Sequence, residues 1–219
     1  MSQWAMVFPG QGSQSIGMLS EIYNQYSMVS DVFNTASEQL GYDLWSLISN
    51  GPLEQLNQTV YTQPALFVAE YALWQCWCSQ TDLRPNWMAG HSLGEYSALA
   101  CAGVFSFQDG LDLVVTRANA MQAAVPEGIG SMAAVIGLTD DQVVEICHRC
   151  AEGEVLSPAN WNTVGQVVLA GHHAAVERAI QAALDSGAKI AKKIPVSVPS
   201  HCSLMQPAVE ALMDTFNGI

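Results

Sequence analysis

The sequence predicts an α/β protein in which a parallel-sheet core domain carries a small α+β insertion. Two observations support this prediction. Up to Pro126, short apolar runs alternate with long helical segments, which is typical of a parallel sheet covered by helices. After Pro126 the segments change in character, and their predicted order becomes β-α-β-β-α-β. We therefore expect a core domain at 1–127 plus 197–219 and a subdomain at 128–196.

Two short apolar runs are the predicted strands of the core. Residues 5–8 form the first, which leads into Pro9-Gly10-Gln11-Gly12. Residues 87–89 form the second, which stops at Gly90. Each run ends in glycine-rich sequence, and this combination predicts a buried strand followed by a loop.

Helix signals lie between and after these strands. We predict helices over 30–41, 62–79, 95–101 and 106–123. Ser30 is a candidate N-cap, and Gly41 ends that helix. Thr62 is expected to cap the second helix, with Pro64 in its first turn. A Ser-x-x-Asp capping box opens the last of the four.

The insertion has shorter elements. We predict strands over 131–136, 155–159, 166–170 and 190–198, and helices over 139–150 and 174–186. The resulting order is the ferredoxin-like pattern, so the subdomain at 128–196 is expected to have that fold.

The composition bounds the function. Half of the 219 residues are hydrophobic and only 12% are charged, which predicts a large buried core. Seven Lys plus Arg oppose twenty Asp plus Glu, and the net charge of −13 repels nucleic acid and anionic membranes. We expect neither as a partner. Since no membrane span or signal peptide is evident, we expect a cytoplasmic protein with reduced cysteines.

Two cysteines resemble half of a metal site. Cys147-His148-Arg149-Cys150 has the spacing of a ligand pair, but it lies in a predicted helix and no second pair has matching spacing. Cys76 and Cys78 would face different sides of a helix. A structural role is therefore the better interpretation, and we expect no metal.

Gly90-x-Ser92-x-Gly94 is the pattern of a nucleophile elbow. A tight strand-to-helix turn strains the serine backbone and exposes its oxygen, and the flanking glycines leave room for the turn. The amides of the following helix can bind a developing oxyanion. Because the motif lies between an apolar run and a helix, we expect a hydrolase-like core. An ordinary glycine-rich turn is the alternative.

Four ordered segments identify a family. They are Phe8-Pro9-Gly10-Gln11-Gly12-Ser13-Gln14, Thr62-Gln63-Pro64-Ala65, Gly90-His91-Ser92-Leu93-Gly94-Glu95-Tyr96 and Val198-Pro199-Ser200-His201. Together they closely resemble bacterial malonyl-CoA:acyl carrier protein transacylase, a family that includes the acyltransferase domains of fatty acid and polyketide synthases. The resemblance extends from Trp4 to about Phe216.

The resemblance implies a ping-pong reaction in fatty acid biosynthesis. Ser92 would attack the thioester of malonyl-CoA, and the phosphopantetheine thiol of acyl carrier protein would then attack the malonyl ester. His201 matches the family's base. A serine hydroxyl needs such a base, although a histidine in this sequence context is, by itself, more often structural. No bound cofactor is implied.

The resemblance also assigns Gln11 to the oxyanion hole, where its backbone N–H would act with that of Leu93. Gln11 follows a predicted buried strand, and sites in α/β sheets gather at such positions. A simple glycine-rich turn is the alternative.

Arg117 is the candidate specificity residue. It falls at the edge of an apolar helical stripe, where it is either a solvated cation or one that faces a cleft. The matching arginine of malonyl-using members pairs with the free carboxylate of the substrate, a task that suits the guanidinium fork.

Two further residues match family positions. His91 would shape the pocket, or it is a packed histidine, which we slightly favour. Asn162 matches a residue near the acyl pocket, and a turn asparagine is the alternative.

The sequence departs from the family at its end. It stops at Ile219, whereas relatives continue, so a C-terminal part is expected to be missing together with the group that orients His201. Two other functions therefore stay open: an acyl-thioester serine hydrolase, and an inactive fragment that binds carrier protein. Lys189, Lys192 and Lys193 are candidates for carrier docking, with a solvated strand face as the alternative. We expect a monomer.

Overall fold

The computed structural model describes residues 3–126 and 128–216, and it divides into two compact units. Of the described residues, the first unit comprises 3–118, and the second comprises 119–126 and 128–216. The protein is a mixed α/β chain with one parallel and one antiparallel sheet. The predicted domains, 1–127 plus 197–219 and 128–196, divide the chain at other positions, and those boundaries stay a prediction.

The first unit contains a parallel strand pair and a set of helices. They are β1 (Ala5–Phe8), α1 (Ser20–Gln25), α2 (Ser27–Leu40), α3 (Leu44–Asn50), α4 (Leu53–Leu56), α5 (Thr59–Gln80), β2 (Trp87–Gly90), α6 (Gly94–Cys101) and the start of α7 (Phe107–Ala124). In the sheet, Ala5 lies opposite Trp87 and Phe8 opposite Gly90. Parallel pairing brings the carboxyl ends of both strands to the same edge.

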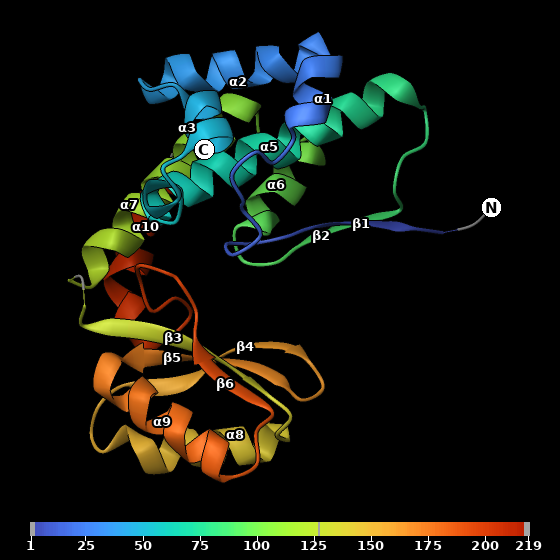
Figure 1. Cartoon of the computed structure of the whole chain (residues 1–219). Helices are drawn as coiled ribbons and strands as arrows, with labels where there is room; N and C mark the ends of the chain where they lie inside the picture. Colours follow the sequence, from blue (N-terminus) through green and yellow to red (C-terminus); the bar gives the residue numbers. More distant parts are fainter. Residues whose placement is uncertain (1–2, 127, 217–219) are drawn as a thin grey trace. The chain divides into compact units, whose positions relative to one another are not determined.

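Helix α5 is the centre of this unit. Its apolar residues occur on all sides, as expected of a helix buried in a core. Helix α2 packs against α5, α5 packs against α6, and α6 packs against both strands (Figure 1). The main apolar cluster joins Phe33, Leu44, Ile48, Phe67 and Leu111. The turn that precedes α6 is therefore held between the sheet and a buried helix.

The predicted N-cap of α2 is wrong by four residues, because Tyr26 and not Ser30 holds that position. The helix begins at Ser27, and the Ser30 hydroxyl donates to the Ser27 carbonyl at 2.7 Å instead of capping. The predicted end is confirmed, because the helix closes at Gly41 with φ 75°, a conformation that glycine adopts without strain.

The predicted start of α5 is also wrong. The helix begins at Thr59, so Pro64 lies inside it. Thr62 does not cap; its hydroxyl is shared between the Leu56 carbonyl at 2.5 Å and the Gln58 carbonyl at 3.0 Å, and the second contact suits a helix interior. Pro64 lacks one backbone donor, and packing of the buried helix on all sides outweighs that loss.

The predicted capping box at the start of α7 is confirmed. The Asp109 backbone N–H donates to Ser106 Oγ at 3.1 Å, and the Ser106 hydroxyl donates to the Asp109 carboxylate at 2.7 Å.

The second unit contains the end of α7 and a four-stranded sheet. Its elements are β3 (Gly130–Ile136), α8 (Asp140–Ala151), β4 (Leu156–Thr163), β5 (Gln166–His172), α9 (His173–Asp185), β6 (Ile190–Lys193), the 3-10 turn η1 (Ser203–Met205) and α10 (Gln206–Phe216). The strand order is β4-β5-β3-β6, and all neighbours are antiparallel. The order of elements from β3 to β6 is the predicted β-α-β-β-α-β.

Strand β6 is shorter than predicted, since it ends at Lys193 rather than near residue 198. The Ile194 N–H still donates to the Met132 carbonyl at 3.0 Å, but Pro195 has no N–H to continue the ladder. The chain leaves the sheet at that point and runs toward His201.

Both faces of the sheet are covered. On one face, Val167 and Leu169 of β5 pack with α8 and α9 (Figure 1). On the other face, Val168 and Ala170 pack with Met132 and with side chains of the 194–202 segment. The alternation along β5 follows the two-residue period of a strand.

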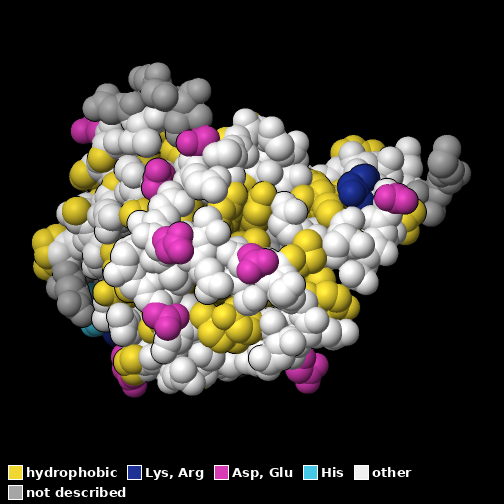
Figure 2. All heavy atoms as spheres, turned by 90° about the horizontal axis from the view of Figure 1, so that it is seen from above, with side chains coloured by type: hydrophobic (Ala, Val, Ile, Leu, Met, Phe, Trp, Pro, Cys, Tyr) yellow, Lys and Arg dark blue, Asp and Glu magenta, His cyan; other side chains and the backbone are white. Residues whose placement is uncertain are grey.

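The surface carries the acidic charge of the sequence. Figure 2 shows acidic side chains scattered over one face with little basic charge among them. Within residues 3–126 and 128–216, no helix combines the length and apolarity that a membrane crossing requires.

Candidate active site

Ser92 lies in the turn between β2 and α6, in a strained conformation. Its φ is 56°, in the left-handed region that non-glycine residues rarely adopt. The flanking glycines make this turn possible. A Cβ on Gly90 would overlap the Gly94 backbone, and a Cβ on Gly94 would overlap the backbone oxygen of Phe8. The geometry is that of a nucleophile elbow.

The loop after β1 lies directly against this turn. The His91 N–H donates to the Phe8 carbonyl at 2.9 Å, and a Cβ on Gly10 would lie 2.5 Å from the His91 oxygen. Gln11 is anchored on α5, because its Nε2 donates to Thr59 Oγ1 at 3.1 Å. The carboxyl ends of neighbouring strands thus bring Gln11 and the Ser92 turn to the same edge.

Two backbone donors at this edge are candidates for an oxyanion hole. Among the hydrogen bonds of the described residues, none is donated by the backbone N–H of Gln11 or of Leu93. Leu93 immediately precedes α6, so its N–H also lies at the positive end of the helix dipole. Such donors can stabilise negative charge on a carbonyl oxygen attacked by Ser92.

Arg117 contacts the candidate nucleophile. Its Nη2 donates to Ser92 Oγ at 3.0 Å, and its Nη1 donates to Gln63 Oε1 at 2.6 Å. The guanidinium carbon lies 5.5 Å from the Tyr96 ring centroid. The residue is only 8% exposed, so it is a buried cation and not the solvated one.

Arg117 has no carboxylate partner among the described residues. Burial lowers the pKa of its guanidinium, and the electrostatic influence of Tyr96 and Glu95 opposes that shift. Burying a cation without a counter-ion is costly. A buried, unneutralised guanidinium is therefore suited to an anionic group of a ligand.

His201 belongs to the second unit, where it lies in a turn and is exposed. Its φ of 62° is also in the left-handed region. The chain on both sides is fixed: buried Val198 and Met205 pack with Met121 and Val125, and the Cys202 thiol donates to the Pro199 carbonyl at 3.2 Å. Ser92 and His201 thus lie in different units, each on a strained turn held by its surroundings.

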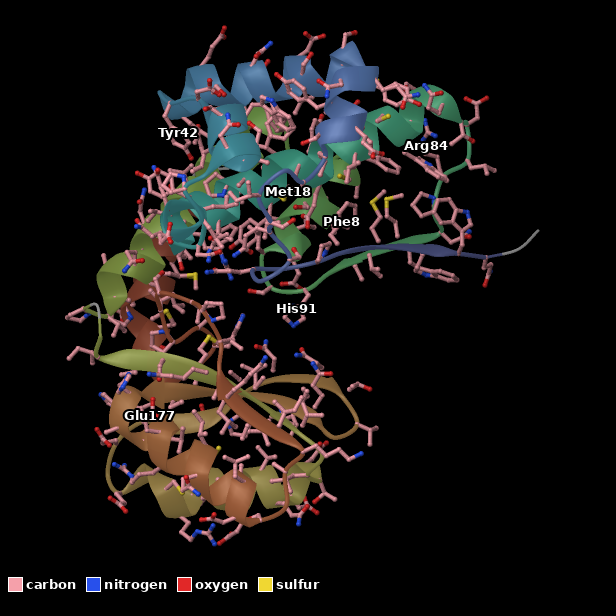
Figure 3. All side chains as sticks on the ribbon, viewed as in Figure 1. Phe8, Met18, Tyr42, Arg84, His91 and Glu177 are labelled. Carbon is pink, nitrogen blue, oxygen red and sulfur yellow. The ribbon has the colours of Figure 1, made fainter. Side chains whose placement is uncertain are left out.

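The remaining candidates of the pocket are exposed. The His91 side chain projects from the loop after β2, away from α6 (Figure 3), and it is exposed, so the prediction of a packed histidine is wrong. Asn162 lies near the end of β4, where the pairing with β5 shifts between Trp161 and Thr163. It is therefore part of an irregular strand rather than of the turn at Gly165.

The three candidate docking lysines are exposed but do not share one face. Lys193 turns toward α9, where its Nζ binds Glu177 Oε1 at 2.7 Å and lies 3.3 Å from His173 Nε2; Figure 3 labels Glu177 on this helix. Because consecutive strand residues point to opposite faces, Lys192 points the other way. Docking of a carrier protein by these residues stays a prediction.

Gln63 and Thr59 are site residues to which sequence reasoning gave no role. Both are fully buried, and both lie one turn apart at the start of α5. One accepts from Arg117 and the other from Gln11. The available signal was a glutamine beside the apolar run of α5, because a buried amide needs partners.

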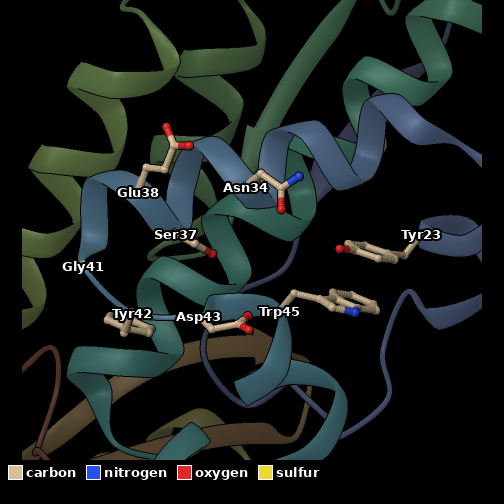
Figure 4. Close-up of a pocket in the computed structure, with 8 residues that line it drawn as sticks. All are labelled: Tyr23, Asn34, Ser37, Glu38, Gly41, Tyr42, Asp43 and Trp45. Carbon is tan, nitrogen blue, oxygen red and sulfur yellow. The ribbon is translucent and has the colours of Figure 1, made fainter.

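A hollow of about 600 Å³ lies elsewhere in the first unit (Figure 4). It is lined by Tyr23, Asn34, Ser37, Glu38, Gly41, Tyr42, Asp43 and Trp45. Tyr23 and Trp45 stack with ring centroids 3.6 Å apart. None of the candidate residues lines it, so we place the chemistry at the Ser92 turn, where the strained backbone and the buried cation lie.

No metal-binding cluster of His, Cys, Asp or Glu is found within the described part of the chain. Cys147 and Cys150 are buried in α8 and pack in the apolar cluster against the sheet. That placement supports the structural role predicted for this pair.

Comparison with known proteins places the chain in a family. The acyl transferase domain family matches residues 5–219. The malonyl CoA-acyl carrier protein transacylase of Salmonella typhimurium is 57% identical over 212 residues, which cover 97% of this chain and 69% of that protein. The enzyme of the same name from Haemophilus influenzae is 53% identical, with 100% and 70% covered.

Solved structures agree. The malonyl CoA-acyl carrier protein transacylase of Coxiella burnetii has a TM-score of 0.97 at 50% identity and covers 100% of this chain and 69% of its own. A malonyl-transacylase in complex with its type II polyketide synthase acyl carrier protein has the same TM-score and identity, with 100% and 71% covered. The matched family, the close relatives and the Ser92 turn together show that this chain belongs to the acyl transferase family.

Proposed function

We propose that the protein transfers a malonyl group from malonyl-CoA to the phosphopantetheine thiol of acyl carrier protein, a reaction of fatty acid biosynthesis. The observation that carries this proposal is the buried Arg117, which donates to Ser92 Oγ and has no carboxylate partner among the described residues. The relatives named for this reaction support it.

The first half-reaction forms an ester on Ser92. His201 accepts the Ser92 proton while Oγ attacks the thioester carbonyl carbon. The carbonyl oxygen becomes negative and is stabilised by the N–H groups of Gln11 and Leu93. When the tetrahedral intermediate collapses, the carbon–sulfur bond breaks and CoA leaves as a thiol with the proton that His201 returns.

The second half-reaction reverses these roles. The carrier thiol gives its proton to His201, and its sulfur attacks the malonyl ester carbon. The ester bond to Ser92 breaks, Oγ regains the proton, and the malonyl thioester leaves on the carrier. No oxidant, reductant or bound cofactor takes part.

Arg117 accounts for the choice of a malonyl group. Malonyl carries a free carboxylate one carbon from its thioester carbonyl, and Arg117 lies at hydrogen-bond distance from the atom that attacks that carbonyl. A guanidinium binds both oxygens of a carboxylate at once. An acetyl group has no such carboxylate and would leave the buried cation unpaired.

The proposal also covers the fold class of each unit, two further substrate contacts, the cellular location and the oligomeric state. We assign the first unit to the hydrolase-like class on the strand–elbow–helix geometry at Ser92, and the β3–β6 sheet to the ferredoxin-like class on its element and strand order. His91 and Asn162 are proposed to contact substrate. A cytoplasmic location and a monomeric state stay predictions.

A product assay separates this function from the alternatives. The protein is mixed with malonyl-CoA and carrier protein, and malonyl-carrier and free malonate are quantified. The proposal predicts malonyl-carrier as the main product. Mainly free malonate would show a serine hydrolase, and carrier binding without either product would show a binding fragment.

A further inference from the structure

Gln63 is the hydrogen-bond partner that fixes the candidate specificity residue. Its side chain is fully buried, and its Oε1 accepts from Arg117 Nη1 at 2.6 Å. The other terminal nitrogen of the same guanidinium donates to Ser92 Oγ at 3.0 Å. The Tyr96 ring lies 5.5 Å from the guanidinium carbon. Gln63 and Ser92 therefore hold the guanidinium at two of its nitrogens.

We propose that Gln63 is a positioning residue that sets the preference for acyl groups carrying a carboxylate. This inference rests on the function proposed above. A glutamine oxygen can orient the guanidinium, but it carries no charge and so leaves the cation unneutralised. An arginine has five N–H donors, and the contacts of Arg117 with Gln63, Ser92 and Tyr96 need no more than three of them. The remaining donors and the full charge stay available for the substrate.

The charge at position 63 matters more than its shape. Glutamate has nearly the same size, but it would form a buried ion pair with Arg117 at this distance. A substrate carboxylate would then have to compete with an internal carboxylate for the same cation. The neutral amide therefore favours malonyl groups, and a charged side chain there would remove that preference.

The start of α5 also explains why this residue can act with precision. Thr59 lies one turn before Gln63, and it accepts from Gln11 Nε2 at 3.1 Å. Two consecutive turns of one buried helix thus hold the candidate oxyanion loop and the candidate specificity residue. A rigid helix is a better support for such a pair than a loop.

The test compares Gln63→Glu with three other variants. Gln63→Met keeps the volume but removes the acceptor. Arg117→Ala, alone and combined with Gln63→Glu, shows whether position 63 acts through Arg117. Gln75→Glu is the matched control, because it adds the same charge to the same helix about 18 Å further along. Gln75 is half-buried and lines a different hollow.

Two readouts are measured for each variant. Acylation kinetics with malonyl-CoA and with acetyl-CoA give KM and kcat. Calorimetric binding of both thioesters to the same substitutions in a Ser92→Ala background gives the preference without turnover. If the unsubstituted protein is not acylated, the proposed function fails, but the binding preference still tests the role of Gln63.

We expect Gln63→Glu to raise KM for malonyl-CoA and its Kd by roughly tenfold or more, because charge-assisted pairs of this kind are worth more than a neutral hydrogen bond. Values for acetyl-CoA should change by a clearly smaller factor, because an acetyl group has no carboxylate to pair with Arg117. Gln63→Met should raise KM and Kd for malonyl-CoA by a smaller factor. Gln75→Glu should leave these values unchanged for both thioesters. In the Arg117→Ala background, Gln63→Glu should not alter the preference further.

Two results would overturn the inference. One is an equal loss for malonyl-CoA and acetyl-CoA in Gln63→Glu, which would indicate a structural role. The other is the same loss of preference with and without Arg117. If Gln63→Glu does not fold, Gln63→Met decides the matter: an unchanged malonyl preference in that folded variant would also contradict the proposal.

Discussion

The Nη2 of Arg117 donates a hydrogen bond to Ser92 Oγ at 3.0 Å. The cation proposed to recognise the substrate is therefore bound to the proposed nucleophile. A substrate carboxylate that takes the Arg117 donors would release a lone pair on Oγ, the atom that must attack. Recognition of malonyl and activation of Ser92 are thus linked through one guanidinium.

Replacing Arg117 should separate the two acyl groups. Arg117→Ala is expected to lower kcat/KM for malonyl transfer by roughly 30-fold to 5,000-fold, since loss of one partner of a buried charged pair costs about 2–5 kcal/mol. Acetyl transfer should stay unchanged or rise, because the hydrogen bond that occupies Ser92 is lost. Steady-state kinetics with both thioesters measure this. Equal losses for the two would contradict the assigned role.

The turn at Ser92 should not tolerate a side chain at Gly94. Gly94→Ala places a Cβ against the backbone oxygens of Phe8 and Pro9, which cannot move without breaking the strand pair. We expect a loss of more than about 3 kcal/mol in the free energy of unfolding, or no folded protein. Gly103→Ala is the control, because its Cβ meets nothing within 4 Å and only its φ of 79° carries a cost. Urea denaturation compares them, and similar losses would argue against the steric account.

Removing His201 should affect chemistry rather than binding. His201→Ala is expected to lower the rate of Ser92 acylation by about 100-fold to 10,000-fold, the usual contribution of a general base. The Kd for malonyl-CoA should stay within about twofold, as for a substitution that removes no binding contact. Rapid-quench acylation and calorimetry give the two numbers. A variant that acylates at the original rate would show that another group is the base.

Stability should fall as the pH rises, because of Glu70. This side chain is 6% exposed, and neither carboxylate oxygen has a well-formed hydrogen bond among the described residues. Burial raises the pKa of Glu70 from 4.5 to about 7, more than the nearby Ser97 hydroxyl lowers it. Between these values the unfolded chain loses a proton that the folded chain keeps. The contribution of the protonated Glu70 carboxyl to the free energy of unfolding is therefore full below about pH 4.5 and is lost by about pH 7.

Glu70→Gln should remove this dependence. We expect the variant to be more stable than the unsubstituted protein at pH 8, by up to about 3 kcal/mol, and to differ little at pH 4.5. Glu54→Gln, an exposed carboxylate on α4, is the control. Thermal unfolding between pH 4.5 and pH 8 is the measurement. Parallel curves for Glu70→Gln and the unsubstituted protein would show that Glu70 is not protonated in the folded state.

The structure narrows the set of lysines in the second unit that are proposed to dock carrier protein. The charge of Lys193 is balanced by its ion pair with Glu177, so Lys189 and Lys192 are the better candidates for binding an acidic partner. Changing these two to Glu should raise KM for carrier protein several-fold and leave KM for malonyl-CoA unchanged, since rim charges act mainly on association. Similar effects on both substrates would remove the docking hypothesis.

The strands and the main helices could be predicted from local signals. The apolar runs before the two glycine-rich loops are β1 and β2, and the Ser-x-x-Asp box opens α7. Helix starts were less predictable where tertiary packing decides them. Thr62 is a residue type that commonly caps helices, yet α5 begins at Thr59, because the buried helix extends in the N-terminal direction beyond Thr62. The end of β6 depends on Pro195, which the apolar pattern alone does not reveal.

The candidate site was predictable where a motif demands a backbone shape. The glycines around Ser92 have to be small for steric reasons, and the structure shows the contacts that require it. Periodicity could not decide whether Arg117 is solvated or buried. Arg117 lies at the edge of the apolar side of its helix, and a residue there can face either water or a cleft. The role of Gln63 depends on a contact between residues 54 positions apart, which only the fold brings together.

The central claim is tested most directly by the mass of the intact protein after incubation with malonyl-CoA, and separately with acetyl-CoA. The account predicts one malonyl adduct on the unsubstituted protein, none on Ser92→Ala, and a much lower yield on Arg117→Ala. Acetyl-CoA should give little adduct. A malonyl adduct that persists in Ser92→Ala, or its absence from a folded unsubstituted protein, would contradict the account.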